Sequence, residues 1–245
     1  MRLCVVMLAV IACRGGDKPA QKAEPAAAAA PTPEIAAAAA TASSDMDPGH
    51  CGQQPFAEST PLPEASAAAW LAIDGKLALV IVSDSGNNGA YAVLDPDTGV
   101  TREQGKLPLG TGASDDIEGF AAHDGKLFGL TSDGWMRVWQ RKGSGFDLVE
   151  GPYAIGTQAD GTTCPTKKKC AINYEGLALA TTPQGCAGFA CSKGEGRVYC
   201  LTEQGGHYAI DRSRSIAVTK PNALGDCTFD DRDGLWVGDN VFGLD

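Results

Sequence analysis

A strand-turn-strand unit returns along the chain at intervals of about 50 to 60 residues, and the dipeptide Asp-Gly marks its turn. The repeating turns are Asp74-Gly75, Asp124-Gly125 and Asp233-Gly234, and a related turn lies near Gly185. Short apolar or alternating segments flank each turn. Both central residues of a type I′ turn have positive φ, so Asp-Gly between such segments predicts a β-hairpin.

Repetition of an all-strand unit of this size is typical of propeller blades. We therefore predict an all-β fold, a β-propeller of about four to six blades, over residues 51–245. The alternative is a β-sandwich, which does not require similar successive units. The last unit ends after its second or third strand, so either a segment near residues 54–60 completes it or the ring is shortened.

The first thirteen residues predict an export signal with a lipid attachment site. An apolar run from Cys4 to Ala12 is too short to span a membrane but suits a secretory signal. Its end, Val-Ile-Ala-Cys13, resembles the lipobox of bacterial lipoproteins. That resemblance implies a signal peptide over residues 1–12, a diacylated Cys13 and, because Arg14 follows, the outer membrane of the bacterial cell envelope. An ordinary signal peptide with an incidental cysteine is the alternative.

Residues 13–50 predict the lipidated cysteine and a disordered tether rich in alanine and proline. Between Ala20 and Ala42, 13 of 23 residues are alanine. Three prolines interrupt the run, and there is no apolar face to bury, so a stable helix is not expected.

The charge of the chain argues against one class of partner. It has 30 Asp and Glu against 20 Lys and Arg, for a net charge of −10. Phosphate binding needs a basic face, so we expect no nucleic-acid partner. The expected partners are the membrane, through the lipid anchor, and a protein or small-molecule ligand.

Two segments share a Glu-Gly core, and two others share a Ser-Asp strand end. They are Asp116-Ile-Glu118-Gly-Phe-Ala, Asn173-Tyr-Glu175-Gly-Leu-Ala, Ser83-Asp84-Ser-Gly and Thr131-Ser-Asp133-Gly. Through them, residues 66–243 resemble the phytase-like β-propeller family labelled "esterase-like activity of phytase". The resemblance implies a hydrolase of phosphate or carboxyl esters. Ala68 in the first unit and Cys227 in the fourth take the place of the glutamate.

Equivalent positions of successive blades converge on the channel of a propeller. The repeat aligns Glu118 with Glu175 and Asp116 with Asn173, so we predict that these four residues gather near the axis. Gathered carboxylates repel one another, and a hard cation relieves that repulsion. The four are therefore candidate metal ligands, with Ca²⁺ as the candidate cofactor. In the alternative interpretation they cap strand ends by bonding backbone N–H groups.

Seven cysteines remain once Cys4 leaves with the signal and Cys13 is lipidated, and pairing is expected in an oxidising compartment. Short separations predict local bridges between Cys164 and Cys170 and between Cys186 and Cys191. The remaining three compete for one long-range bridge: Cys51, Cys200 and Cys227. Zinc is the alternative use of the four close cysteines, although they lack the two-residue spacing of a zinc knuckle.

The sequence identifies no catalytic residue. It contains no Gly-x-Ser-x-Gly motif, and its three histidines fall in the tether, in a hairpin turn and at the start of an outer strand. Two functions remain open. We favour a lipid-anchored, extracytoplasmic binding or scaffold module with a cation in its central channel. The alternative is a metal-dependent hydrolase, either phytase/esterase-like or lactonase-like, because propellers host both classes.

Overall fold

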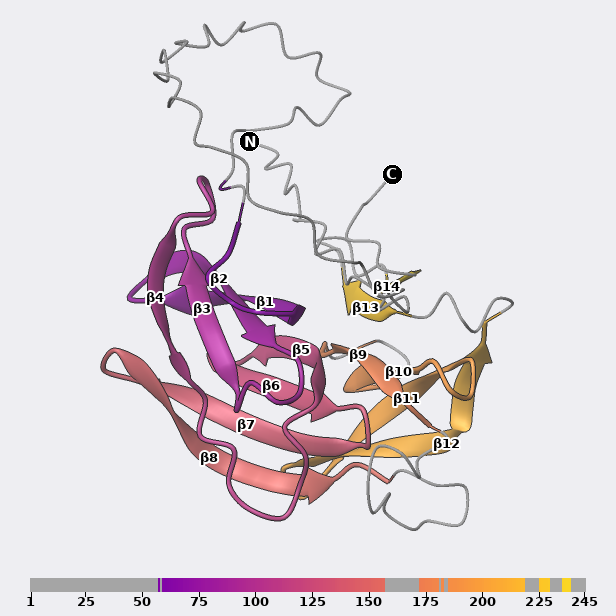
Figure 1. Cartoon of the computed structure of the whole chain (residues 1–245). Helices are drawn as coiled ribbons and strands as arrows, with labels where there is room; N and C mark the ends of the chain where they lie inside the picture. The colour runs from indigo at the N-terminus through magenta and orange to yellow at the C-terminus, as the bar shows by residue number, and fades with distance from the viewer. Residues whose placement is uncertain are drawn as a thin grey trace, which may run out of the picture.

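The computed structural model describes residues 57, 59–156, 172–180, 182, 185–218, 225–229 and 235–238, which form strands and turns (Figure 1). No helix in these residues is long and apolar enough to cross a membrane. The predicted signal, Cys13 and the tether lie outside the described residues, as do Cys51 and the predicted Cys164–Cys170 bridge.

Three four-stranded antiparallel sheets follow one another along the chain, and a two-stranded sheet follows them. Blade 1 consists of β1 (Ala65–Ile73), β2 (Lys76–Ser83), β3 (Ala90–Leu94) and β4 (Thr101–Lys106). Blade 2 consists of β5 (Ile117–His123), β6 (Lys126–Thr131), β7 (Trp135–Lys142) and β8 (Gly145–Ala154). Blade 3 consists of β9 (Tyr174–Ala178), β10 (Gly188–Ser192), β11 (Arg197–Gln204) and β12 (His207–Ala217). Blade 4 is the pair β13 (Asp226–Phe229) and β14 (Leu235–Gly238).

The sheets are arranged as propeller blades, with the first strand of each on the inside (Figure 1). β1 packs against β5, β5 against β9, and β9 against β13. Each complete sheet runs outward from its first strand to its fourth in chain order. Two face-to-face sheets would not give this pattern, so the prediction of an all-β propeller is confirmed. The described residues contribute three complete blades and one strand pair.

Two of the three predicted Asp-Gly hairpin turns have the predicted geometry, and the third, Asp233-Gly234, lies outside the described residues. Asp74 and Gly75 have φ of 50° and 74°, and Asp124 and Gly125 have φ of 48° and 71°. These are the two positive φ values of a type I′ turn, which joins β1 to β2 and β5 to β6.

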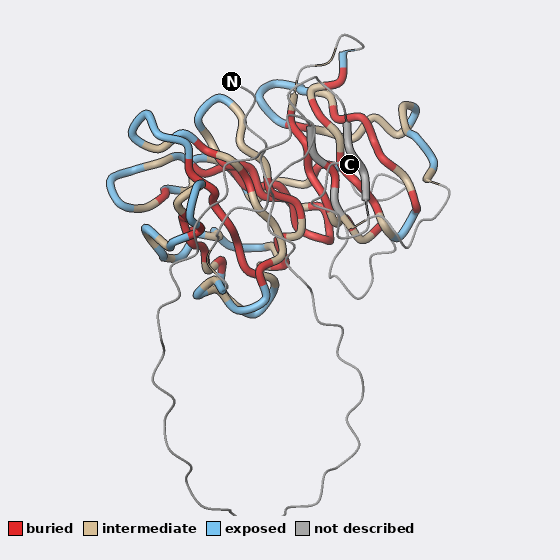
Figure 2. Tube along the Cα trace, turned by 90° about the horizontal axis from the view of Figure 1, so that it is seen from above, coloured by how far each residue is buried: buried red, intermediate tan, exposed pale blue. Residues whose placement is uncertain are grey.

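The apolar core lies between the blades, and the exposed residues concentrate at the turns (Figure 2). Side chains alternate along β7. Met136 and Val138 pack with Tyr174 of blade 3, whereas Trp139 packs with Tyr91 of blade 1. Trp139 is fully buried, and its indole N–H donates to the Pro108 carbonyl at 2.7 Å. Blade 2 therefore holds both of its neighbours through opposite faces.

The predicted bridge between Cys186 and Cys191 is wrong, because Cys186 pairs with Cys200 of β11. The Cα atoms of this pair are 5.5 Å apart, within the range of a disulfide. Cys191 lies inside β10, where the chain rises about 3.3 Å per residue and so moves away from Cys186. Its thiol is free and buried beside Ala178 and Val198. A short separation in the chain is therefore not a short distance when a strand lies between the two cysteines.

Tryptic peptide mapping under non-reducing conditions checks this pairing. Cleavage after Lys193 and Arg197 separates Cys186 from Cys200, so we expect a cross-linked pair of peptides. Replacing both residues by Ala is expected to lower the free energy of unfolding by about 2–3 kcal/mol, since the bridge closes a short loop. An intact single peptide containing a Cys186–Cys191 bridge would contradict the structure.

Candidate metal centre

The first strand of each complete blade contains a β-bulge at the same place, opposite the end of the second strand. The extra residue is Ser66 in β1, Glu118 in β5 and Glu175 in β9. Bulges turn a side chain in a new direction and are common beside functional sites. The register also corrects the sequence alignment, because Ser66 and not Ala68 is the blade 1 counterpart of the two glutamates.

Gly119, which follows the bulged Glu118, has a packing role. A Cβ atom there would lie 2.8 Å from the backbone nitrogen and Cβ of Leu177 and 2.9 Å from the carbonyl carbon of Gly176. Real Cβ atoms do not approach backbone atoms so closely. The Glu-Gly pair therefore combines a redirected carboxylate with close contact between β5 and β9.

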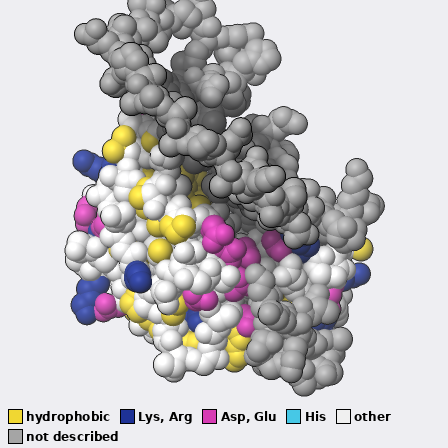
Figure 3. Space-filling view, in the orientation of Figure 1, with side chains coloured by type: hydrophobic (Ala, Val, Ile, Leu, Met, Phe, Trp, Pro, Cys, Tyr) yellow, Lys and Arg dark blue, Asp and Glu magenta, His cyan; other side chains and the backbone are white. Residues whose placement is uncertain are grey.

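Three carboxylates from two blades meet at the bulge of β5. Each of Asp84, Asp116 and Glu118 offers an oxygen, and these oxygens all lie within 4.8 Å of one another. Asp116 is buried and the other two are half-buried. Acidic side chains also gather on the molecular face in the region of β5 (Figure 3). The structure thus brings together two of the four predicted ligands and adds Asp84, which the sequence analysis did not include.

Hydrogen bonds across the junction of blades 1 and 2 hold Asp84 close to Asp116 and Glu118. The Asp115 carboxylate accepts the backbone N–H groups of Gly86 and Asn88 at 3.0 and 3.2 Å. It therefore ties the loop after β2 to the residues that lead into β5. Asp116 is fixed from its own blade, since Ser132 donates its N–H to the Asp116 carbonyl at 3.0 Å and its hydroxyl to the Asp116 carboxylate.

A buried cation lies behind this junction. Arg137 is completely buried, and its Nε donates to the Leu109 carbonyl at 2.7 Å. Burial lowers the pKa of Arg137, while the carboxylates of Asp133 and Asp115 act in the opposite direction. The positive charge of Arg137 therefore lies within electrostatic reach of Asp115, the residue that holds the Asp84 loop.

Asn173 and Glu175 have partners within blade 3. The Asn173 side-chain amide donates to Glu175 Oε1 at 2.5 Å, and Lys193 Nζ lies 3.3 Å from the same oxygen. Lys193 follows β10 as Asp84 follows β2, so the charge at this position is reversed between the two blades. The ammonium group offsets the Glu175 charge. A role for Asn173 and Glu175 as metal ligands stays a prediction.

The cluster of Asp84, Asp116 and Glu118 has the chemistry of a site for a hard cation. At an effective dielectric constant of about 20, two carboxylate charges at this separation repel by roughly 3–4 kcal/mol. A cation bound between them removes that cost. All three donors are oxygens, which suit Mg²⁺, Ca²⁺ or Mn²⁺, whereas zinc favours Cys and His. The acidic cluster is therefore able to bind a metal ion.

Comparison with known proteins gives only distant likenesses. No protein-family model matches the chain, and no curated protein matches it. Among solved structures, it is similar to a provisionally assigned 6-phosphogluconolactonase from Bacteroides uniformis, with 16% identity and a TM-score of 0.42 over 71% of this chain and 50% of that one. It is also similar to the glutaminyl cyclase of Myxococcus xanthus, with 15% identity and a TM-score of 0.36 over 76% and 89%. The chain spans half the length of the first structure, and neither likeness carries an argument about activity.

The contact between β5 and β9 is tested by Gly119→Ala. The added methyl group would overlap the backbone of β9, so we expect the free energy of unfolding to fall by about 1–3 kcal/mol, measured by urea denaturation. Gly145→Ala is the matched control, because a Cβ there meets only the Tyr91 hydroxyl at 4.0 Å. Equal stability of the two variants would refute this account of the Glu-Gly pair.

Proposed function

We propose that the chain is a lipid-anchored propeller of the bacterial cell envelope that binds Ca²⁺ and uses the bound ion to hold a protein or small-molecule ligand. The observation that carries the proposal is the convergence of Asp84, Asp116 and Glu118 from two neighbouring blades. The three carboxylates lie at the inner strands, so the charge of this surface depends on whether a cation is bound.

Calcium is favoured over other hard cations by the kind of site. Ca²⁺ accepts six to eight oxygen ligands in flexible geometry, whereas Mg²⁺ demands a near-ideal octahedron. The carboxylates here come from a strand bulge and from a loop of another blade, so they are not held in one regular frame. Such a site leaves coordination positions for water or for an oxygen atom of the ligand.

A second candidate function is a metal-dependent hydrolase. The observation that favours it is the resemblance of the Glu-Gly and Ser-Asp segments to the phytase-like propellers. In that case the cation would polarise an ester or lactone substrate, and Asp84, Asp116 and Glu118 would bind the cation. The binding function is preferred because it requires only a cation site, for which Asp84, Asp116 and Glu118 offer oxygens, and no further catalytic group.

Calorimetric titration of the mature chain with Ca²⁺ tests the proposed site. Asp116→Asn and Glu118→Gln are each expected to weaken binding by about tenfold or more, because affinity follows the number of charged ligands. Asp97→Asn, an exposed carboxylate in the β3–β4 turn, is the control and should bind as the wild type does. Glu175→Gln reports whether blade 3 participates. No calcium-dependent heat, or unchanged affinity in the first two variants, would refute the site.

The same variants separate the two functions. Turnover of phosphate esters, carboxyl esters or lactones that requires Ca²⁺ and is lost in Glu118→Gln would favour the hydrolase. Calcium binding without turnover on these panels would favour the binding module.

The lipid anchor is tested independently of the cation. Mass spectrometry of the native protein should show a mature N-terminus at Cys13 carrying a diacylglyceryl group. Cys13→Ser is expected to leave the chain unprocessed or released from the membrane fraction. An unmodified N-terminus further along the chain would contradict the anchor.

A further inference from the structure

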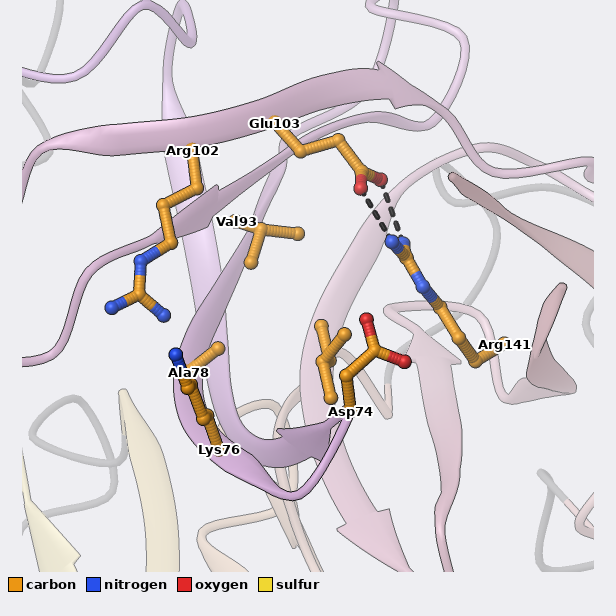
Figure 4. Close-up of a pocket in the computed structure, with 8 residues that line it drawn as sticks. Asp74, Lys76, Ala78, Val93, Arg102, Glu103 and Arg141 are labelled. Atoms are coloured by element: carbon orange, nitrogen blue, oxygen red, sulfur yellow. Dashed lines mark hydrogen bonds and ion pairs between the residues drawn. The ribbon is translucent and has the colours of Figure 1, made fainter. Parts of the chain in front are cut away.

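A cavity of about 580 Å³ lies at the junction of blades 1 and 2, beside the turn that joins β1 to β2 (Figure 4). Its volume is in the range of small-molecule sites. Eight residues line it: Ile73, Asp74, Lys76, Ala78, Val93, Arg102, Glu103 and Arg141. Three of these are apolar, three are basic and two are acidic, so the lining is positive in a chain of net charge −10.

One ion pair in this wall is internally satisfied. Arg141 of β7 donates to both carboxylate oxygens of Glu103 of β4, at 2.8 and 2.6 Å. The Tyr91 hydroxyl donates to the same carboxylate at 2.6 Å. These hydrogen bonds, that from Arg141 above all, hold the pKa of Glu103 below its usual value. This network fixes the wall between the two blades and leaves little net charge on it.

Apart from this pair, the lining carries two basic groups, Lys76 and Arg102, and one acidic group, Asp74. Lys76 and Arg102 point toward each other across the cavity, and Asp74 lies on the side of Arg141 (Figure 4). Arg102 also pairs with Asp95 through one of its terminal nitrogens, which leaves further N–H donors of the guanidinium. Lys76 has no ion pair among the described residues.

We propose that this cavity binds a small organic anion, with the anionic head group between Lys76 and Arg102 and an apolar body against Ile73, Ala78 and Val93. The inference is independent of the proposed calcium site. Lys76 and Asp84 stand at opposite ends of β2, and eight residues of extended chain span roughly 25 Å. That separation exceeds the screening length in physiological salt.

Titration of the purified mature chain with hexanoate, followed by amide NMR spectra, tests the proposal. Hexan-1-ol and hexylammonium are neutral and cationic probes of the same length. Hexanoate is expected to give saturable shifts at residues 74–78 and 101–103 and to bind more tightly than either counterpart. Lys76→Gln and Arg102→Gln should each weaken hexanoate binding by about three- to fivefold, the range of exposed ion pairs.

Two further variants test the direction of the charge effect and provide a control. Asp74→Asn removes a repelling charge, and Asn tolerates the positive φ of this turn, so hexanoate should bind more tightly. Lys126 follows Asp124-Gly125 as Lys76 follows Asp74-Gly75, but it lies outside the cavity lining, so Lys126→Gln should change nothing. Absent saturable shifts, equal binding of hexan-1-ol, weaker binding in Asp74→Asn, or equal losses in Lys76→Gln and Lys126→Gln would overturn the proposal.

Discussion

The close approach of β5 to β9 is the constraint on which the centre of this molecule depends. Without a Cβ, Gly119 lets β5 lie directly on the backbone of Gly176 and Leu177. The bulge immediately before it turns Glu118 out of the regular alternation of the strand. Packing and function are thus coupled in two adjacent residues. The glycine sets the distance between blades, and the bulge aims the carboxylate toward neighbouring carboxylates instead of into the apolar core.

Polar contacts between blades add specificity to this packing. Ser66 donates to the Ile117 carbonyl at 2.7 Å, and Tyr153 accepts the Tyr208 N–H at 3.2 Å. Each contact joins a residue of one blade to the next blade along the chain. Apolar faces alone would tolerate sliding of one sheet over another, whereas a hydrogen bond has a narrow range of distance and angle. The register between blades, and with it the position of Asp84 beside Asp116, follows from such bonds.

What could be predicted from the sequence was largely local. The Asp-Gly turns and the alternation of apolar residues gave the hairpins and the blades, and the aligned Glu-Gly segments gave Asp116 and Glu118, two members of the acidic cluster. Asp84 required knowledge of a loop from the preceding blade, held by hydrogen bonds to Asp115. The β1–β2 hairpin has more residues between its bulge and its turn than the β5–β6 hairpin has. An alignment counted from the turn therefore misses Ser66. The predicted Cys186–Cys191 bridge was wrong because sequence separation alone does not distinguish the five residues of β10 from a loop.

The distribution of charge over blades 1 and 2 suggests how an acidic chain can serve two ligands of opposite sign. The carboxylates gather where β2 ends and β5 begins, whereas Lys76 and Arg102 flank the turn at the other end of blade 1. In blade 1, Lys76 and Arg102 therefore lie at the opposite end of the sheet from Asp84. Because screening in salt acts over about 8–10 Å, the cluster of Asp84, Asp116 and Glu118 does not repel an anion between Lys76 and Arg102. The net charge of −10 therefore does not determine the sign of a ligand at any one site.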